Sequence, residues 1–480
     1  MSTRKSLFFS FLDRYASLAI SIIYSMVIAR LLTPGELGIF SVTMVLLGFV
    51  STVRDMGAGQ YLVQEKELTT DRIRAVWAVQ LGLGIGLAIL VLLASYPVAL
   101  FYEEPRMRNI MLLVALNYLI NPFGSLTYAW LMREMRFESV ALMRFSSALG
   151  GAVVSSVLAW KDYGPISLAF GSVASTLINA LLAVRFRPKT FPWLPGTKEL
   201  RRVLGFGSRL TGGSILVSLA SSAPELFLGK LQSLTAAGLY SRAGGLVQMF
   251  YRLFVDAVWV VCLPWFAKQN REEGNFIEPF LKATSYVTVF GWSFCLVVMC
   301  LAQPIIRILY GDQWDQAVDI TRLLAFAMLF TVPAALCQPA LLSAGQIHAI
   351  TRVNFYNAAV TVIFVALGAW QGLTIIGFCM IAAAIVCATL WLRTIAKFIE
   401  MPVIELLRSW HKSMLVALLA GVGPAIALWA YGPYPKNFLM VFLLGGAGSL
   451  FGFLIGIFVF RHPLSEEISR FWSKLNFRIV

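Results

Sequence analysis

The chain has 480 residues, of which 59% are hydrophobic and 13% are charged, and its formal net charge at pH 7 is +15. Soluble domains carry about 25% charged residues, so a soluble core could not absorb this much apolar surface. Apolar runs of about 20 residues, the length that crosses roughly 30 Å of hydrocarbon, recur along the whole chain. The composition therefore predicts an all-α polytopic membrane protein.

Fourteen apolar segments are predicted to be transmembrane helices. In chain order they are residues 7–31, 37–58, 75–98, 109–130, 140–160, 164–184, 204–229, 236–263, 283–306, 320–343, 353–370, 373–392, 413–431 and 438–460. Asp13 and Arg14 interrupt the first segment and no small-residue cleavage site follows it, so we interpret it as a helix and not as a removed signal peptide. The six cysteines lie in apolar segments without metal-ligand spacing, which indicates packing residues, no disulfides and no metal site.

The distribution of Lys and Arg predicts the orientation, because cytoplasmic loops retain positive charge. With the N-terminus inside, the inner segments carry 25 of these residues and the outer loops carry 5. Both termini are therefore predicted to lie in the cytoplasm. Because the basic excess lies in short loops and not in one patch, it favours membrane lipids over nucleic acid as the partner.

Two stretches 200 residues apart resemble each other. "ARLLTPGELGIFS" at 29–41 aligns without a gap on "GKLQSLTAAGLYS" at 229–241, and the alignment pairs Gly38 with Gly238. The chain is therefore predicted to build one outer helical hairpin twice, once in each half.

Each copy of this hairpin contains a helix start signal. Thr33 is predicted to be the N-cap of the second helix, with Pro34 at its first position and Glu36 completing a capping box. Ser233 is the equivalent cap in the second copy, where Ala236 lacks the reciprocal carboxylate.

The basic loop 185–203 follows the sixth helix and separates the two halves. Six is an even number, so the second half enters the membrane in the same sense as the first, and transporters with such parallel repeats bind substrate between the halves. The predicted domains are a six-helix bundle (1–184), a cytoplasmic linker (185–203), a second six-helix bundle (204–392), a cytoplasmic loop (393–412), two further helices (413–460) and a cytoplasmic tail (461–480).

Nine basic residues remain inside or at the margins of the predicted helices. All are arginine: Arg14, Arg30, Arg54, Arg144, Arg209, Arg242, Arg252, Arg307 and Arg322. An arginine at the bilayer centre costs roughly 2.5–3.5 kcal/mol, so it normally faces a cavity inside the protein. Several lie near helix ends, where extension toward the headgroups is the alternative. Arg252 lies near the middle of its helix, where that alternative does not apply.

Helical spacing places some of these residues on shared faces. Arg14 lies on a stripe with Ser17 and Ser21, and Arg242, Arg252 and Asp256 share one face of another helix. Serine stripes also bind helices together, but the full positive charge on the stripes of Arg14 and Arg252 favours a hydrophilic cavity.

Three acidic residues accompany the arginines, namely Asp55, Glu225 and Asp256. They are candidates for binding a coupling proton or sodium ion, or they neutralise nearby arginines. No other cofactor is predicted. Even with these acids, the arginine excess predicts a cationic interior that suits an anionic substrate such as a diphosphate.

Several motifs resemble those of the Wzx-type polysaccharide flippases, in the multidrug, oligosaccharidyl-lipid and polysaccharide exporter superfamily. They are "ARLLTPGELGIFSV" from 29, "RDMGAGQYLVQEKEL" at 54–68, "YAWLMREMRFES" at 128–139, "LYGDQWDQAV" at 309–318 and "RHPL" at 461–464. The resemblance implies two six-helix bundles that form a V around a cationic cavity, with two further helices after them.

The resemblance also implies a function. Such a protein moves undecaprenyl-diphosphate-linked oligosaccharide from the inner to the outer leaflet of the bacterial cytoplasmic membrane by alternating access, and supplies a polysaccharide polymerase and chain-length machinery. In related lipid flippases, arginines on helices 1, 2 and 8 line the cavity. Arg14, Arg54, Arg242 and Arg252 occupy those helices here, matched by helix and not by motif.

Two other classes fit less well. A multidrug antiporter of the same superfamily, which expels organic cations, usually has twelve helices and an acidic cavity. A glycan polymerase or ligase would need a sizeable outer loop or a polar catalytic cluster, and all predicted outer loops are short. The sequence therefore predicts a transporter and not an enzyme.

The predicted topology can be tested with single cysteines. In a Cys-free background, Lys189→Cys in the basic linker and Gln313→Cys in an outer loop should react with membrane-impermeant thiol reagents from opposite sides. Labelling of both cysteines from the same side would contradict the fourteen-helix topology.

Overall fold

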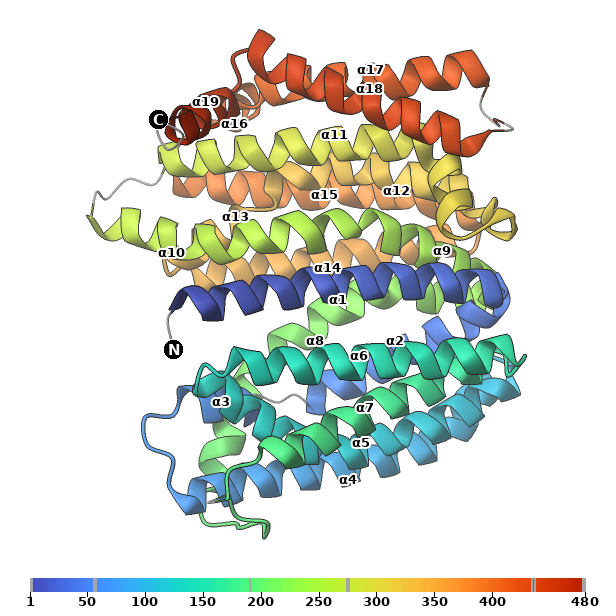
Figure 1. The fold of residues 1–480 in the computed structure, drawn as a ribbon, viewed down its shortest axis with the longest axis vertical. Coiled ribbons are helices and arrows are strands. Elements are labelled where there is room, and N and C mark those ends of the chain that lie inside the picture. The colour runs from blue at the N-terminus through green and yellow to red at the C-terminus, as the bar shows by residue number, and fades with distance from the viewer. Residues whose placement is uncertain are drawn as a thin grey trace. The chain divides into compact units, whose positions relative to one another are not determined.

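The computed structural model describes the backbone of residues 3–54, 58–189, 191–272, 277–432, 435 and 437–476. Within these residues every regular element is a helix (Figure 1). The predicted all-α class is therefore confirmed. The six cysteines are free thiols, as expected for packing residues.

The chain divides into two compact units, Met1–Gly238 and Leu239–Val480. The first contains α1 (Thr3–Leu31), α2 (Pro34–Arg54), α3 (Ala58–Gln64), α4 (Thr70–Phe101), α5 (Pro105–Arg133), α6 (Phe137–Trp160), α7 (Ile166–Phe186) and α8 (Leu200–Leu231). The boundary lies within α9 (Leu234–Val247). Because α8 belongs to the first unit, the compact units do not coincide with the sequence halves predicted around the linker 185–203.

The second unit continues α9 through a short π-helix, η1 (Tyr251–Val255). Its further elements are α10 (Asp256–Glu272), α11 (Ile277–Leu309), η2 (Asp312–Trp314), α12 (Ala317–Thr331), η3 (Val332–Ala334), α13 (Cys337–Ser343), α14 (Ile347–Ala369), α15 (Leu373–Phe398), α16 (Val403–Ser409), α17 (His411–Tyr431), α18 (Phe438–Val459) and α19 (Pro463–Asn476).

Twelve helical stretches among the described residues are long and apolar enough to cross a membrane. They coincide with twelve of the fourteen predicted segments. The other two segments, 7–31 and 204–229, fall on α1 and α8, parts of whose side chains are outside the described residues. The polytopic class is confirmed, whereas the count of fourteen remains a prediction.

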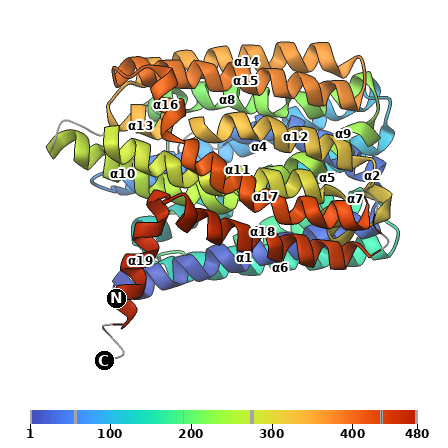
Figure 2. The same ribbon diagram turned by 90° about the horizontal axis from the view of Figure 1, so that it is seen from above.

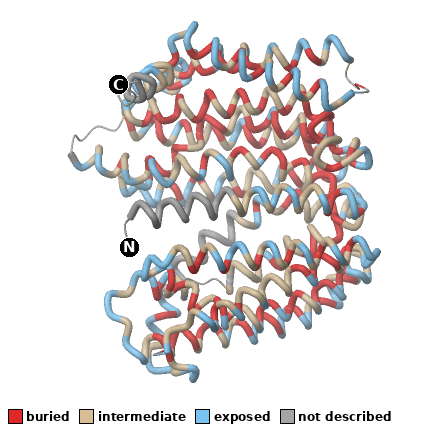
Figure 3. Tube along the Cα trace, viewed as in Figure 1, coloured by how far each residue is buried: buried red, intermediate tan, exposed pale blue. Residues whose placement is uncertain are grey.

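Many exposed residues, pale blue in Figure 3, lie on these helices, and large apolar residues are among them. Examples are Leu93 at 72%, Trp429 at 88% and Phe451 at 68% of full exposure. Water would penalise such surfaces, whereas hydrocarbon does not, so these faces suit contact with lipid.

The helix start signals of the repeated hairpin are confirmed. The Thr33 backbone N–H donates to Glu36 Oε2 at 2.9 Å, and the Glu36 N–H donates to Thr33 Oγ1 at 3.3 Å, which is the predicted capping box. In the second copy, the Ala236 N–H donates to Ser233 Oγ at 3.1 Å.

The two copies of the hairpin also contact each other, within the first unit. A Cβ atom on Gly38 would lie 1.7 Å from the Leu234 carbonyl oxygen, and one on Gly238 would lie 2.1 Å from that of Pro34. The two contacts are equivalent under the 200-residue repeat. Glycine is therefore required at both positions because backbone approaches backbone there.

Small residues join α17 to α18, which lie side by side in both views (Figures 1 and 2). A Cβ on Gly423 would lie 2.4 Å from the backbone of Gly448, and one on Gly452 would lie 2.4 Å from the Leu419 carbonyl oxygen. Such spacing of small residues lets membrane helices approach closely. The pair packs on α11 of the second unit.

His462, from the "RHPL" motif, is fully buried where α18 turns into α19. Its Nε2 lies 3.0 Å from Ser413 Oγ, and its Nδ1 accepts the Leu464 backbone N–H at 3.2 Å. Burial and the nearby charge of Lys412 lower the pKa of His462 to about 4, so the ring is neutral at pH 7. The motif therefore anchors α19 to α17.

The glycine contact generates a stability prediction. Gly38→Ala should lower the thermal unfolding temperature of the purified protein, because overpacking typically costs about 1–3 kcal/mol. Gly48→Ala on the same helix is the matched control, because its Cβ would meet nothing within 4 Å. Equal unfolding temperatures for the two variants would contradict the contact.

Candidate functional site

The structure describes five of the seven predicted site residues. Asp55 and the side chain of Arg14 lie outside the described residues, so their predicted roles remain predictions. Arg54 and Glu225 belong to the first unit, whereas Arg242, Arg252 and Asp256 belong to the second.

Arg54 is the last residue of α2 and is half-buried. Its guanidinium carbon lies 5.9 Å from the centre of the Tyr118 ring on α5. The Tyr118 hydroxyl donates to the Leu47 carbonyl oxygen at 3.0 Å, which fixes the ring against α2. A cation over an aromatic face is attracted by the ring, so this contact orients Arg54.

Arg54 lines a cavity of about 400 Å³ enclosed by α2, α3, α4 and α5, which we call the α2–α5 cavity. The volume is within the roughly 300–1,000 Å³ of small-molecule sites. Besides Arg54, its polar lining consists of amides and hydroxyls: Gln60, Gln64, Gln80, Asn121, Ser125 and Tyr128. The described lining residues include no carboxylate.

Gln80 is the most buried of these amides. It is 9% exposed, and its fully buried Oε1 atom has no hydrogen-bond partner among the residues that the structure describes. Buried acceptors without partners are uncommon, because losing the hydrogen bond to water costs free energy. Gln60 and Gln64 are exposed on α3, so the amides extend from the surface to the interior of the cavity.

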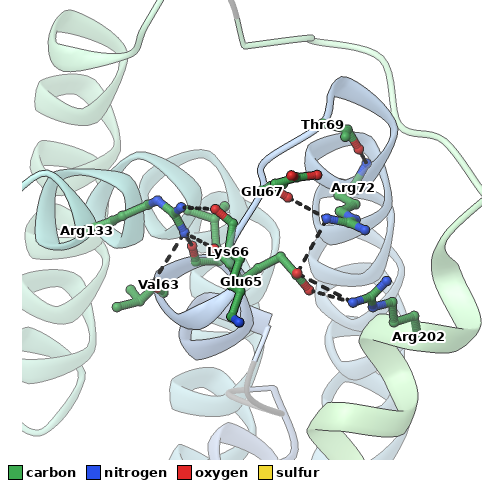
Figure 4. A network of polar contacts seen from close by, with 9 residues as sticks. Val63, Glu65, Lys66, Glu67, Thr69, Arg72, Arg133 and Arg202 are labelled. Carbon is green, nitrogen blue, oxygen red and sulfur yellow. Dashed lines mark hydrogen bonds and ion pairs between the residues drawn. The ribbon is translucent and has the colours of Figure 1, made fainter.

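Arg133, at the end of α5, holds α3 in place (Figure 4). Its Nη1 donates to the carbonyl oxygens of Leu62 at 2.9 Å and Glu65 at 2.5 Å, and its Nη2 donates to that of Lys66 at 3.1 Å. The last carbonyls of a helix have no partner within the helix, so Arg133 caps α3. It thereby positions the two α3 glutamines.

The loop after α3 is fixed by a second set of contacts, also drawn in Figure 4. The Glu65 carboxylate lies 3.4 Å from Arg72 Nη1 on α4 and 3.3 Å from Arg202 Nη2 on α8. Arg72 Nη1 also donates to the Glu67 carbonyl oxygen at 2.6 Å. The loop at the end of the cavity is therefore tied to two neighbouring helices.

The described part of the α1 serine stripe faces α6 and α7. Ser17 and Ser21 line a second cavity, of about 300 Å³, together with Ser155, Ser172 and Ser175. α1 packs on α6, and Ser17 and Ser21 line the cavity between these helices, whereas the predicted hydrophilic role of the stripe stays a prediction.

Glu225 on α8 accepts a hydrogen bond from Ser41 Oγ on α2, at 2.5 Å. The contact lies within the first unit and joins the two copies of the repeated hairpin region. Glu225 therefore has a hydroxyl donor in the structure.

Arg242 lies at the start of the second unit, beside the motif "LYGDQWDQAV". Its guanidinium carbon is 5.9 Å from the centre of the Tyr310 ring and 6.0 Å from that of Trp314, which is fully buried. Arg307 binds Asp315 of the same motif with two hydrogen bonds, at 2.9 and 2.5 Å. Residues of this motif therefore contact Arg242 and Arg307, two of the nine arginines inside or at the margins of the predicted helices.

Arg252 lies on the π-helix η1, where the Asp256 N–H donates to the Tyr251 carbonyl oxygen five residues earlier. Its Nη2 donates to the Gly245 carbonyl oxygen at 3.1 Å, and the residue is exposed. Asp256, the first residue of α10, is also exposed. Single π-turns in α-helices are frequent at functional sites.

An apolar cavity of about 450 Å³ lies within the second unit, which we call the α11–α17 cavity. It is lined by side chains of α11, α12, α15, α16 and α17, among them Trp292, Leu329, Leu392, Leu407 and Leu418. The predicted thirteenth helix, α17, thus supplies one wall of an apolar space beside the second bundle.

The cavity amides were not predicted from the sequence. Each is a neutral polar residue in an otherwise apolar or short helix, such as Gln80 in "WAVQLGLG". That signal was available, because buried amides in membrane helices need partners. Two motifs noted in the sequence, 54–68 and 128–139, supply Gln60, Gln64, Tyr128 and Arg133, so the structure brings these motifs together.

Similarity to known proteins identifies the family of this chain. The model of a polysaccharide biosynthesis protein family matches residues 27–319. The chain belongs to that family. The succinoglycan biosynthesis transport protein ExoT of Rhizobium meliloti (strain 1021) is 23% identical over 91% of this chain and 89% of its own length.

Two further proteins are similar to this chain, one in sequence and one in fold. The lipopolysaccharide biosynthesis protein WzxC of Escherichia coli (strain K12) is 22% identical over 64% of this chain and 63% of its own length. The predicted resemblance to Wzx-type proteins is therefore confirmed. The lipid II flippase MurJ, in an inward closed conformation, has the same fold, with a TM-score of 0.76 at 14% identity, over 95% of this chain and 99% of MurJ.

The cap on α3 can be tested by hydrogen exchange. Arg133→Ala should raise the amide exchange rates of residues 58–69 about tenfold or more, because hydrogen bonds from a charged group contribute about 1.5–3 kcal/mol. Arg136→Ala is the matched control, since this exposed arginine lies over the Trp130 ring instead. Unchanged exchange in the Arg133 variant would show that the cap does not hold α3.

Proposed function

We propose that the protein moves undecaprenyl-diphosphate-linked oligosaccharide from the inner to the outer leaflet of the bacterial cytoplasmic membrane, by alternating access, for the export of a surface polysaccharide. Family membership and the twelve apolar helices support a membrane protein of polysaccharide biosynthesis. The fold shared with a lipid flippase and the likeness to a succinoglycan transport protein support this transport reaction.

The observation that carries the proposal is the exposed Arg252 on a π-turn in the middle of an apolar helix. A guanidinium there is costly unless it meets a cavity or an anion, and its planar fork matches the geometry of phosphate oxygens. A guanidinium has five N–H donors, and this one is exposed, which suits binding of a substrate diphosphate. An antiporter for organic cations would instead need carboxylates at such positions.

Arg54, Arg242 and Arg14 complete the proposed diphosphate-binding set. Arg54 lines a cavity, and Arg242 is oriented by two aromatic rings. The positive charge of this set would compensate the diphosphate during transfer through hydrocarbon.

The α11–α17 cavity is suited to the lipid tail. Its walls are nearly all apolar, and a polyprenyl chain gains free energy from burial against apolar surface in proportion to the area covered. We propose that α17 shelters part of this tail while the diphosphate crosses the membrane.

Ion coupling is a further part of the proposal. The candidate carboxylates for a coupling proton or sodium ion are Asp55, Glu225 and Asp256. Glu225 is the first candidate to test, because the Ser41 hydroxyl donates a hydrogen bond to it. On the outer face, a polysaccharide polymerase and its chain-length machinery would receive the delivered glycan.

The test is surface glycan in cells that lack the native gene, with membrane abundance as the control for folding. Arg252→Ala should abolish export, because losing one charge-assisted hydrogen bond costs about ten- to a hundredfold in affinity. Arg252→Lys keeps the charge without the planar fork and should be partly active.

The double variant Arg252→Ala with Asp256→Ala separates substrate binding from charge neutralisation. If Arg252 binds the diphosphate, the double variant should remain inactive. Normal glycan from Arg252→Ala, or full recovery in the double variant, would remove Arg252 from the substrate site.

A further inference from the structure

We infer that the α2–α5 cavity binds one uncharged sugar ring of the transported glycan, with the buried Gln80 amide as its deepest hydrogen-bonding group. The inference rests on the proposed function and adds a ligand chemistry to it. Apart from Arg54, which also belongs to the proposed diphosphate-binding set, the polar lining of this cavity is neutral, so the ligand itself needs no charge.

The lining of the cavity is the first reason. Amides both donate and accept hydrogen bonds, as the hydroxyl groups of a sugar do, and four amides line one space of about 400 Å³. Met132, Pro122 and the Tyr128 ring supply apolar surface for the C–H faces of a pyranose. A mixture of a few directed polar groups with apolar walls is typical of small-molecule sites.

The lining also argues against other ligands. A cation would need carboxylates, and the described lining residues include none. A diphosphate would need several cationic groups, whereas Arg54 is the one cationic residue among them. A lipid chain would leave the four amides without partners, which is costly in hydrocarbon.

The unpaired Gln80 oxygen is the second, independent reason. Gln80 is more than nine-tenths buried, lines the cavity, and keeps Oε1 without a partner among the described residues. A rotation of the Gln80 side chain that exposes Oε1 to the cavity would let a ligand hydroxyl donate to it. Sites that hydrogen-bond a substrate hydroxyl discriminate strongly against ligands that lack it.

The rigidity of the surrounding helices is the third reason. Arg133 fixes the end of α3 and therefore Gln60 and Gln64, as described above. On the opposite wall, Gly84 of α4 packs against α5, because a Cβ there would lie 2.5 Å from the Tyr118 carbonyl oxygen. Pro122 provides no N–H for that carbonyl, so the close approach of Gly84 occurs where α5 lacks one helical hydrogen bond.

The test compares Gln80→Leu with a matched control, Gln303→Leu. Gln303 is also a buried glutamine, 1% exposed and with unpartnered side-chain atoms, but it lies on α11 of the second unit, away from this cavity. Both leucine variants should unfold at the same temperature as the parent protein or above it, because each removes at least one buried side-chain atom without a hydrogen-bond partner among the described residues.

Affinity is measured for two lipids with the full-length protein in nanodiscs. One is the lipid-linked glycan extracted from cells that lack the native gene, and the other is undecaprenyl diphosphate without sugar. Gln80→Leu should weaken binding of the glycan-linked lipid roughly three- to tenfold and leave the affinity for undecaprenyl diphosphate unchanged. Gln303→Leu should change neither affinity.

The outcomes separate this inference from the proposed function. If the parent protein binds neither lipid, the proposed function fails and the sugar site fails with it. If the parent binds both lipids but Gln80→Leu weakens them equally, or weakens neither, the sugar site is overturned while the flippase proposal stands. A fall in unfolding temperature with equal loss of both lipids would assign Gln80 to structure alone.

Discussion

Hydrocarbon cannot hydrogen-bond, and this constraint governs the structure at every level. Backbone groups in the bilayer must pair within their own segment, which leaves helices as the regular elements of the described chain. The same constraint acts on side chains. A serine hydroxyl can donate to a backbone carbonyl of the preceding turn, as Ser147 does to the Met143 carbonyl oxygen. An arginine or a glutamine cannot be satisfied so locally, and these residues gather at caps, aromatic rings and cavities.

The repeated hairpin shows how two distant stretches come to share one role. Each copy begins its helix with a hydroxyl cap, and each places a glycine one turn later against a carbonyl of the other copy. The same glycine-to-carbonyl contact is made twice, at positions 200 residues apart. A side chain at either glycine would therefore push the two hairpins apart at both contacts. The repeat is therefore maintained by reciprocal backbone packing, which explains why glycine and not merely a small residue occurs at both positions.

Helix positions, caps and cysteine roles could be predicted from the sequence because they depend on local composition. The second segment was predicted to continue to residue 58, yet α2 ends at Arg54 and α3 is a separate helix from Ala58. The polar character of Gln60 and Gln64 was insufficient to show this, because the cap that defines α3 comes from Arg133, about seventy residues later. The division into compact units was equally unpredictable, since it depends on which helices α8 packs against.

The candidate site was predicted only in part for the same reason. Formal charge identifies arginines in an apolar sequence, so Arg54, Arg242 and Arg252 could be named. Whether such a residue faces a ring, a carbonyl or a cavity depends on neighbours from other helices. A search for charged residues does not find neutral amides, although Gln80 is more buried than Arg54, Arg242 or Arg252.

A lipid-linked glycan has three chemically different parts, and the described chain offers a different surface for each. The amides of the α2–α5 cavity match hydroxyl groups, the arginines match phosphate oxygens, and the α11–α17 cavity matches an isoprenoid chain. A cationic drug shares none of these three requirements. Under the proposed function, substitutions among the cavity amides would change which sugar is accepted, whereas Arg242, Arg252 and the α11–α17 cavity would bind the diphosphate and the lipid.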